Sequence, residues 1–164
     1  MERRIPLAAL AVVYLLGTGC NDDDNDFLPP EEETEFMASL TGNAERPDPV
    51  TTTATGTASI SIDESAQTID FTITVANMTD ITDAHIHIGG VNEAGPPVVD
   101  LLVIALVPGP VNGELSAGVV AATDIFGGET FATLIEKIRD GMAYINVHTI
   151  TNTSGEIRGQ LVPD

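Results

Sequence analysis

The sequence predicts an all-β fold, an antiparallel Greek-key β-sandwich or barrel, with one short helix near residues 130–140. Three observations lead to this prediction. From residue 36 onward, apolar and polar residues alternate with a period of two, which is typical of strands buried on one face. Clusters of Gly, Pro, Asn and Asp separate these runs, as turns separate the strands of a sheet. One convincing stretch has the apolar spacing of a helix.

The clearest strand is TIDFTITVANM, residues 68–78. Its alternate apolar side chains share one face, which we expect to meet the core: Ile69, Phe71, Ile73 and Val75. The same pattern predicts strands in five further runs: ATGTASISI (54–62), ITDAHIHIG (81–89), VVDLLVIALV (98–107), MAYINVHT (142–149) and GEIRGQLV (155–162). Short strands at this spacing, with hairpin-type turns between them, favour an antiparallel sheet.

The helix is predicted in TFATLIEKIRDG, residues 130–141. Its apolar residues fall on one helical face: Phe131, Leu134, Ile135 and Ile138. Thr130 or Glu129 is placed to cap the start, and Gly141 is placed to end the helix.

Length and charge limit the function. The 164 residues are enough for one domain with a single hydrophobic core. The formal net charge of −19, with only six basic residues, argues against nucleic acid or an anionic membrane surface as a direct partner. Such surfaces are bound through patches of Lys and Arg, which this chain does not have in sufficient number.

Residues 1–19 are typical of a lipoprotein export signal. A short basic region precedes an apolar run, Ile5 to Leu16, that is too short to cross a bilayer. The run leads to Cys20, the only cysteine, in a context that resembles the lipobox of bacterial lipoproteins. That resemblance implies that Cys20 becomes the lipid-modified first residue of the mature chain. Because Gly17 stands where the box usually has Leu, secretion without a lipid anchor is the alternative.

An acidic tether is predicted over residues 20–35. The sequence NDDDNDFLPPEEETE is poor in apolar residues and dense in like charge, so it cannot bury enough surface to fold. We expect it to be extended and to hold the folded domain, residues 36–164, away from a membrane to which Cys20 is anchored. The protein is then exported and lies on the bacterial cell envelope.

The histidines are placed unusually. The chain has three, of which two stand in AHIHIGG as His85 and His87 and the third in YINVHT as His148. On a strand, His85 and His87 share one face while Ala84 and Ile86 face the core. The same alternation turns a set of polar side chains outward on the two C-terminal runs: Tyr144, Asn146, His148, Glu156, Arg158 and Gln160. If these runs neighbour one another, the outer sheet face is an organised polar surface.

Two interpretations of this face stay open. Imidazole nitrogens suit copper and zinc, so His85, His87 and His148 are candidate ligands of one metal ion. Alternatively, the histidines form hydrogen bonds across strands and hold loops in place. Tyr144, Asn146, Glu156 and Arg158 are candidate residues for binding another ligand, although Glu156 and Arg158 are also placed to form an exposed ion pair of small value.

Three segments together resemble the CHRD domain: FMASLTGNAERPDPVTTTATGTASISID, ITDAHIHIGGVNEAGPPVVDLL and GMAYINVHTITNTSGEIRGQLV. They run from Phe36 to Val162 in the expected order and contain LTG, E-x-P, AHIH, GP-x-V, NVHT and GEIRGQL. One departure is Asp48, which interrupts the usual Pro-rich pair within a turn. The resemblance implies an extracytoplasmic β-sandwich module without an established biochemical role.

The His-x-His strand also resembles, more distantly, that of the copper-zinc superoxide dismutases, so the fold is expected to be immunoglobulin-like or superoxide-dismutase-like. The bridging and zinc ligands of that family and its cysteine pair have no counterparts, so dismutase activity is not expected. Two hypotheses follow. The first is a non-enzymatic envelope module that binds an unknown protein or envelope ligand. The second is a copper- or zinc-binding metalloprotein, and the sequence does not settle whether the chain is an enzyme.

Overall fold

The computed structural model describes residues 34–102 and 106–164. The predicted export signal, Cys20 and the tether up to residue 33 lie outside the described residues. The first strand, β1 (Glu35–Thr41), begins one residue before the predicted domain boundary, and the Thr34 carbonyl already accepts a hydrogen bond from Ile62. Glu35 is therefore a strand residue and not part of the tether. Within the described ranges, no helix is both long and apolar enough to span a bilayer.

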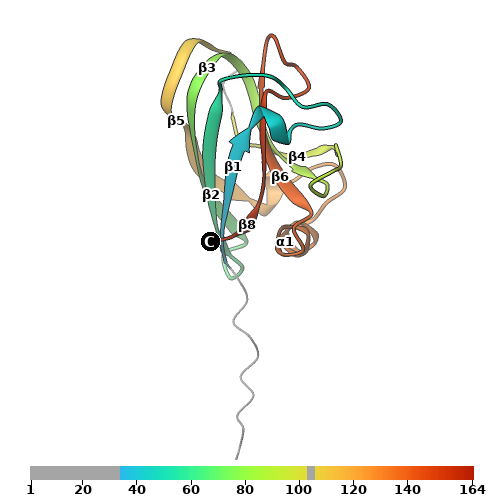
Figure 1. The fold of residues 1–164 in the computed structure, drawn as a ribbon. Helices are drawn as coiled ribbons and strands as arrows, with labels where there is room; N and C mark the ends of the chain where they lie inside the picture. Colours follow the sequence, from blue (N-terminus) through green and yellow to red (C-terminus); the bar gives the residue numbers. More distant parts are fainter. Residues whose placement is uncertain (1–33, 103–105) are drawn as a thin grey trace, which may run out of the picture. The chain divides into compact units, whose positions relative to one another are not determined.

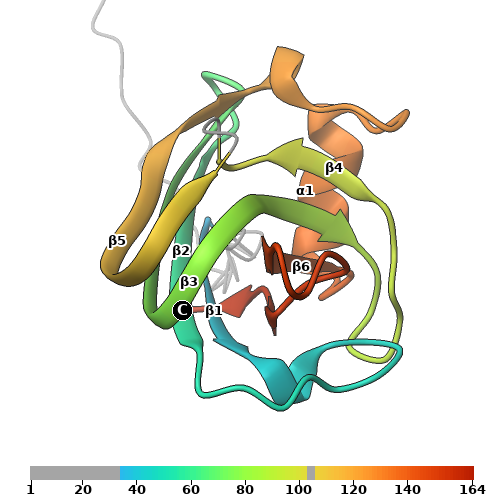
Figure 2. The same ribbon diagram turned by 90° about the horizontal axis from the view of Figure 1, so that it is seen from above.

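Five antiparallel strands close into a barrel (Figures 1 and 2). Around the ring they are β1, β2 (Thr55–Asp63), β3 (Thr68–Ile88), β6 (Ala143–Thr149) and β7 (Ile157–Gln160), and β7 pairs with β1 again. Three further strands extend the sheet: β4 (Pro97–Asp100) and β5 (Val107–Ala121) pair with β3, and β8 (Val162–Pro163) pairs with β1. The predicted all-β antiparallel class is confirmed, in its barrel form.

The strand β3 is long and serves two sides of the barrel. Its first half pairs with β2 and β5, and its second half pairs with β6 and β4. The change of neighbours occurs where Asn77 and Asp80 adopt positive φ angles of 58° and 51° and the register with β5 shifts. Asn and Asp tolerate this conformation better than most residues, and bulges of this kind bend a strand. The sequence predicted two strands here because it contains these turn residues.

The barrel interior is filled by the apolar face of each strand. The buried side chains of the ring strands include Phe36, Leu40, Ile60, Ile73, Ile86, Ile145 and Ile157. Ile69, Ile73 and Val75 are buried as predicted, while Phe71 is half-buried. The alternation therefore identifies the core face of β3 correctly, and it leaves the opposite face of the second half of β3 for the histidines.

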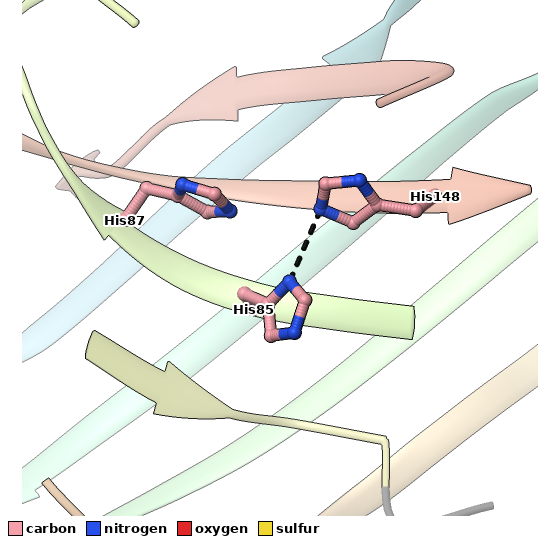
Figure 3. A group of neighbouring side chains, drawn as sticks. All are labelled: His85, His87 and His148. Atoms are coloured by element: carbon pink, nitrogen blue, oxygen red, sulfur yellow. Dashed lines mark hydrogen bonds between the residues drawn. The ribbon is translucent and has the colours of Figure 1, made fainter. Parts of the chain in front are cut away.

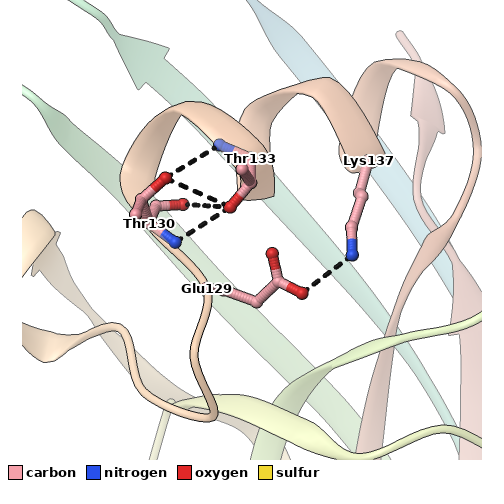
Figure 4. Close-up of polar contacts among 4 residues, drawn as sticks. All are labelled: Glu129, Thr130, Thr133 and Lys137. Atoms are coloured by element: carbon pink, nitrogen blue, oxygen red, sulfur yellow. Dashed lines mark hydrogen bonds and ion pairs between the residues drawn. The ribbon is translucent and has the colours of Figure 1, made fainter.

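One helix, α1 (Phe131–Arg139), lies beside β6 at the lower end of the barrel in Figure 1. Its predicted apolar face is buried: Phe131, Leu134, Ile135 and Ile138. Thr130 caps the start, since its hydroxyl accepts a hydrogen bond from the Thr133 N–H while the Thr133 hydroxyl accepts one from the Thr130 N–H (Figure 4). Lys137 pairs with Glu129 at 2.7 Å, and Gly141 follows the helix with a φ of 68°.

The strands differ from the prediction in two places. The run 98–107 is not one strand: residues 98–100 belong to β4, Leu101 and Leu102 follow without strand pairing, residues 103–105 lie outside the described part, and Val107 begins β5. Conversely, β5 was not predicted, because VPGPVNGELSAG contains Pro108, Pro110 and three glycines, which ordinarily interrupt strands. These residues are tolerated because β5 pairs only with β3, so one of its edges carries no ladder among the described strands.

Candidate metal centre

The three histidines come from two neighbouring strands. β3 supplies His85 and His87, and their neighbours Ala84 and Ile86 are fully buried in the core on the opposite face. β6 supplies His148, two residues beyond Asn146, which pairs directly with His85. This register brings residues that are separated by 63 positions in sequence to one place on the sheet.

The histidine side chains converge (Figure 3). One ring nitrogen from each of His85, His87 and His148 lies within 4.8 Å of the other two. His85 Nδ1 and His148 Nε2 are 3.1 Å apart. Two nitrogens that bind one ion tetrahedrally at 2.0–2.1 Å are about 3.4 Å apart, so a pair at the 4.8 Å limit must close by about 1.4 Å to hold an ion. The residues therefore fit a three-imidazole site after an inward movement of the rings.

Two backbone carbonyls set which nitrogen of His87 and His148 is free. His87 Nδ1 donates to the Gly95 carbonyl at 2.8 Å, and His148 Nδ1 donates to the Thr153 carbonyl at 3.1 Å. Because a carbonyl oxygen only accepts, both Nδ1 atoms carry the proton and both Nε2 atoms carry a lone pair. His87 Nε2 is buried and has no hydrogen-bond partner within residues 34–102 and 106–164.

His85 completes the arrangement. With a lone pair on His148 Nε2, the proton between the two rings belongs to His85 Nδ1. The other nitrogen of His85, Nε2, faces a carboxylate oxygen of Asp100 at 3.4 Å. If a cation replaces the shared proton, His85 can carry its proton on Nε2, toward Asp100, and present Nδ1 as a ligand.

Burial keeps two of the rings neutral. Desolvation lowers the pKa of His87 from 6.5 to about 4, against the opposing effect of its hydrogen bond to Gly95. Burial also lowers the pKa of His148, and the neighbouring His85 adds to this effect. Neutral imidazole is the form that binds metal, so these two rings are ready to bind at neutral pH.

The polar face is covered by protein and is not exposed, which corrects the expectation of an outward-facing surface. Tyr144, Asn146 and Arg158 are 2–3% exposed. The connection between β3 and β4, residues 89–96, which we call the covering segment, supplies the carbonyls to which Arg158 donates. Connections fold over this face because its side chains satisfy their backbone groups, which an apolar face could not do.

The predicted exposed pair of Glu156 with Arg158 is wrong. Arg158 donates to the carbonyls of Glu93 and Gly90 at 2.7 and 2.8 Å, and its guanidinium lies 3.5 Å from the centre of the Tyr144 ring. Glu156 instead accepts hydrogen bonds from Thr52 and Thr149 at 2.7 and 2.8 Å. A buried guanidinium needs several acceptors at once, and the covering segment provides them.

Sequence reasoning missed Glu45. It follows the turn Gly42–Ala44 and is 2% exposed, and its carboxyl accepts a hydrogen bond from the Asn146 amide at 3.2 Å. Burial raises its pKa to about 7, although Arg158 and Asn146 act in the opposite direction. The only sequence signal for Glu45 was its place in the E-x-P motif, which carries no chemistry by itself.

The comparison with protein families gives a match over most of the chain. Residues 36–161 match the family model of the CHRD domain. No curated protein and no solved structure matches the chain. The match covers every histidine and every residue that surrounds them.

Proposed function

Because the chain belongs to the CHRD domain family, we propose that it is an extracytoplasmic binding module whose ligand is a single copper or zinc ion held by His85, His87 and His148. The observation that carries the proposal is the convergence of three imidazole nitrogens, one of which, His87 Nε2, is buried without a hydrogen-bond partner among the described residues. Buried polar atoms are nearly always satisfied, so an orphaned nitrogen at this place needs an explanation.

The donor set favours these two metals. Imidazole suits copper and zinc better than calcium or magnesium, which prefer oxygen ligands. Each ring has an acceptor for its second nitrogen, in Gly95, Thr153 or Asp100, as ligating histidines ordinarily do. Three ligands leave a coordination position open, where a bound ion can act as a Lewis acid or, if it is copper, exchange electrons.

Capture of a protein partner through the same face is less well supported. The candidate contact residues Tyr144, Asn146 and Arg158 are covered, so a macromolecule would first have to displace the covering segment. A metal ion needs no such opening. The side chain of His85 is 16% exposed, which gives an ion a path to the cluster.

The test is a competition titration of the purified protein with copper and with zinc against a chromophoric chelator. We expect one equivalent of metal per chain, and we expect its loss when His85, His87 and His148 are replaced together by Gln. The matched control is Asp70→Asn, which removes an exposed acidic group from β3 and leaves the cluster intact. Metal binding that survives in the triple variant, or a wild type without stoichiometric binding, would reject the proposal.

The proposal includes the location. The protein is exported and anchored to the bacterial envelope by lipid on Cys20, with residues 21–34 as a spacer. Cell fractionation tests this directly. The wild type is expected in the membrane fraction and Cys20→Ala in the soluble extracytoplasmic or medium fraction. The same distribution for both forms would mean plain secretion or retention by other means.

A further inference from the structure

We propose that Tyr144 and Arg158 are positioning residues, which hold the covering segment so that its Gly95 carbonyl determines which nitrogen of His87 carries the proton and which presents a lone pair to the cluster. The metal-affinity part of this inference rests on the proposed function. Its first consequence, the tautomer of His87, is a property of the metal-free protein and can be measured independently.

Arg158 fixes the far part of the covering segment. Its two terminal nitrogens donate to different carbonyls, Nη1 to Glu93 at 2.7 Å and Nη2 to Gly90 at 2.8 Å. The two accepting carbonyls belong to a connection that is largely exposed, since Val91, Asn92 and the Glu93 side chain face solvent. A planar guanidinium can satisfy two carbonyls in fixed positions, whereas a lysine ammonium at the same place cannot reproduce the fork.

Tyr144 fixes the near part. Its hydroxyl accepts a hydrogen bond from the Gly95 N–H at 3.0 Å and donates one to the Gly95 carbonyl at 3.2 Å. Its ring stacks on His87, with the ring centres 4.9 Å apart and an angle of 16° between the planes. The guanidinium of Arg158 contacts the same ring from β7, on the other side of β6 from β3. One side chain therefore touches the metal-ligand candidate, the carbonyl that orients it and the arginine.

Gly95 allows this closeness. A Cβ atom at this position would overlap the carbonyl oxygen of Ile88, so no larger residue fits without moving the backbone. The Ile88 N–H in turn donates to the Pro96 carbonyl at 3.1 Å. The Gly95 carbonyl is thus placed between two donors, His87 Nδ1 and the Tyr144 hydroxyl.

The chemical consequence concerns a single proton. While the Gly95 carbonyl stays in place, His87 keeps its proton on Nδ1 and its lone pair on Nε2, toward His85 and His148. If the carbonyl moves, the two tautomers become closer in energy, and a fraction of the rings presents N–H where a lone pair is needed. Loss of such an orienting group typically weakens metal binding 10- to 100-fold.

The experiment compares the wild type with Tyr144→Phe and Arg158→Lys by long-range ¹H–¹⁵N NMR of the imidazoles, without metal and at pH 7.5. Tyr144→Phe keeps the ring that stacks on His87 and removes only the hydroxyl. The matched control is Arg46→Lys, since Arg46 also donates to two backbone carbonyls, those of Asn43 and Glu45, in a different connection. Copper and zinc dissociation constants are then measured for all four proteins.

We expect His87 to be in the Nδ1–H form in the wild type and Arg46→Lys, and to be a mixture of tautomers in both test variants, with metal affinity 10- to 100-fold weaker. An unchanged tautomer in Tyr144→Phe overturns the inference, even if affinity falls. If Arg158→Lys does not fold, Tyr144→Phe decides alone. A shifted tautomer in a protein whose wild type binds no metal keeps the positioning role and rejects the proposed function.

Discussion

The amide of Asn146 donates a hydrogen bond to the carboxyl of Glu45 across 101 residues of sequence, and both side chains are almost fully buried. In the part of the chain that the structure describes, each still has one oxygen without a hydrogen-bond partner, Oδ1 on Asn146 and Oε1 on Glu45. The contact ties the N-terminal turn after β1 to the strand that carries His148. Because a buried carboxyl is more easily kept neutral than charged, the burial of Glu45 also makes the stability of the fold depend on pH.

The first prediction concerns Glu45→Gln. The pKa of Glu45 is about 7 in the folded state and about 4.5 when unfolded, so the folded protein keeps a proton that the unfolded chain releases between these values. The wild type therefore loses stability relative to Glu45→Gln as the pH rises from 4.5 to 7, by about 3 kcal/mol. Denaturant unfolding of both proteins across this range measures the difference. A constant difference would mean that Glu45 is ionised in the fold.

A second prediction concerns Gly155, at the turn between β6 and β7. Its φ is 126°, and a Cβ there would overlap the side-chain amide of Asn146. Gly128 has a φ of 86° but nothing within 4 Å of a Cβ, which makes Gly128→Ala the matched control for backbone strain alone. We expect Gly155→Ala to lower the free energy of unfolding by about 2 kcal/mol more than Gly128→Ala does. Equal losses in denaturant titrations would show that Asn146 moves aside freely.

A third prediction separates helix stability from the candidate metal centre. Thr130→Ala removes the hydroxyl that accepts from the Thr133 N–H, and we expect a loss of about 1 kcal/mol in the free energy of unfolding. Because α1 supplies none of the histidines or their hydrogen-bond partners, metal affinity should not change. Thr151→Ala, at an exposed position between β6 and β7, is the control and should change stability by less than about 0.5 kcal/mol. A cap variant that weakened metal binding would contradict this separation.

The sequence was informative wherever one local rule decided the outcome. The period of two placed His85 and His87 opposite Ala84 and Ile86, because successive side chains on a strand alternate. The apolar spacing and the capping residue located α1. The predicted all-β architecture and the predicted family are also confirmed. Both predictions relied on local features, namely turn residues and short motifs.

The features that the sequence did not predict depend on strand register and on which sheet face the connections cover, and neither is decided by local sequence. That His85 pairs with Asn146, and so meets His148, follows from how β3 bends at Asn77 and Asp80. The sequence did not predict this bend, because Asn and Asp indicate a turn between two strands as readily as a bulge within one strand. Whether a sheet face is covered depends on where the connections between strands pass, and the local pattern does not reveal this. For this reason the polar face was predicted to be exposed, and Glu45 was not considered as a site residue. Burial then decides the chemistry, since it sets the pKa values of the face.

The last prediction uses His87→Gln in the metal-free protein. The pKa of His87 is about 4 when folded and 6.5 when unfolded, so the unfolded chain binds a proton that the fold rejects. The wild type should therefore lose about 3 kcal/mol relative to His87→Gln as the pH falls from 6.5 to 4. Between pH 4.5 and 6.5 the effect of His87 on the free energy of unfolding has the opposite sign to that of Glu45. The pH dependence of the wild type alone therefore reveals neither group, and only the two differences between wild type and variant do.

Chelator-treated wild type and His87→Gln are unfolded in denaturant at half-unit steps from pH 4 to 7.5. Burial lowers the pKa of His148 in both proteins, so this contribution cancels in the difference. A flat difference curve would mean that His87 is charged or solvated in the fold. In that case its lone pair would not be directed at His85 and His148, and the argument for a three-histidine metal centre would lose its central observation.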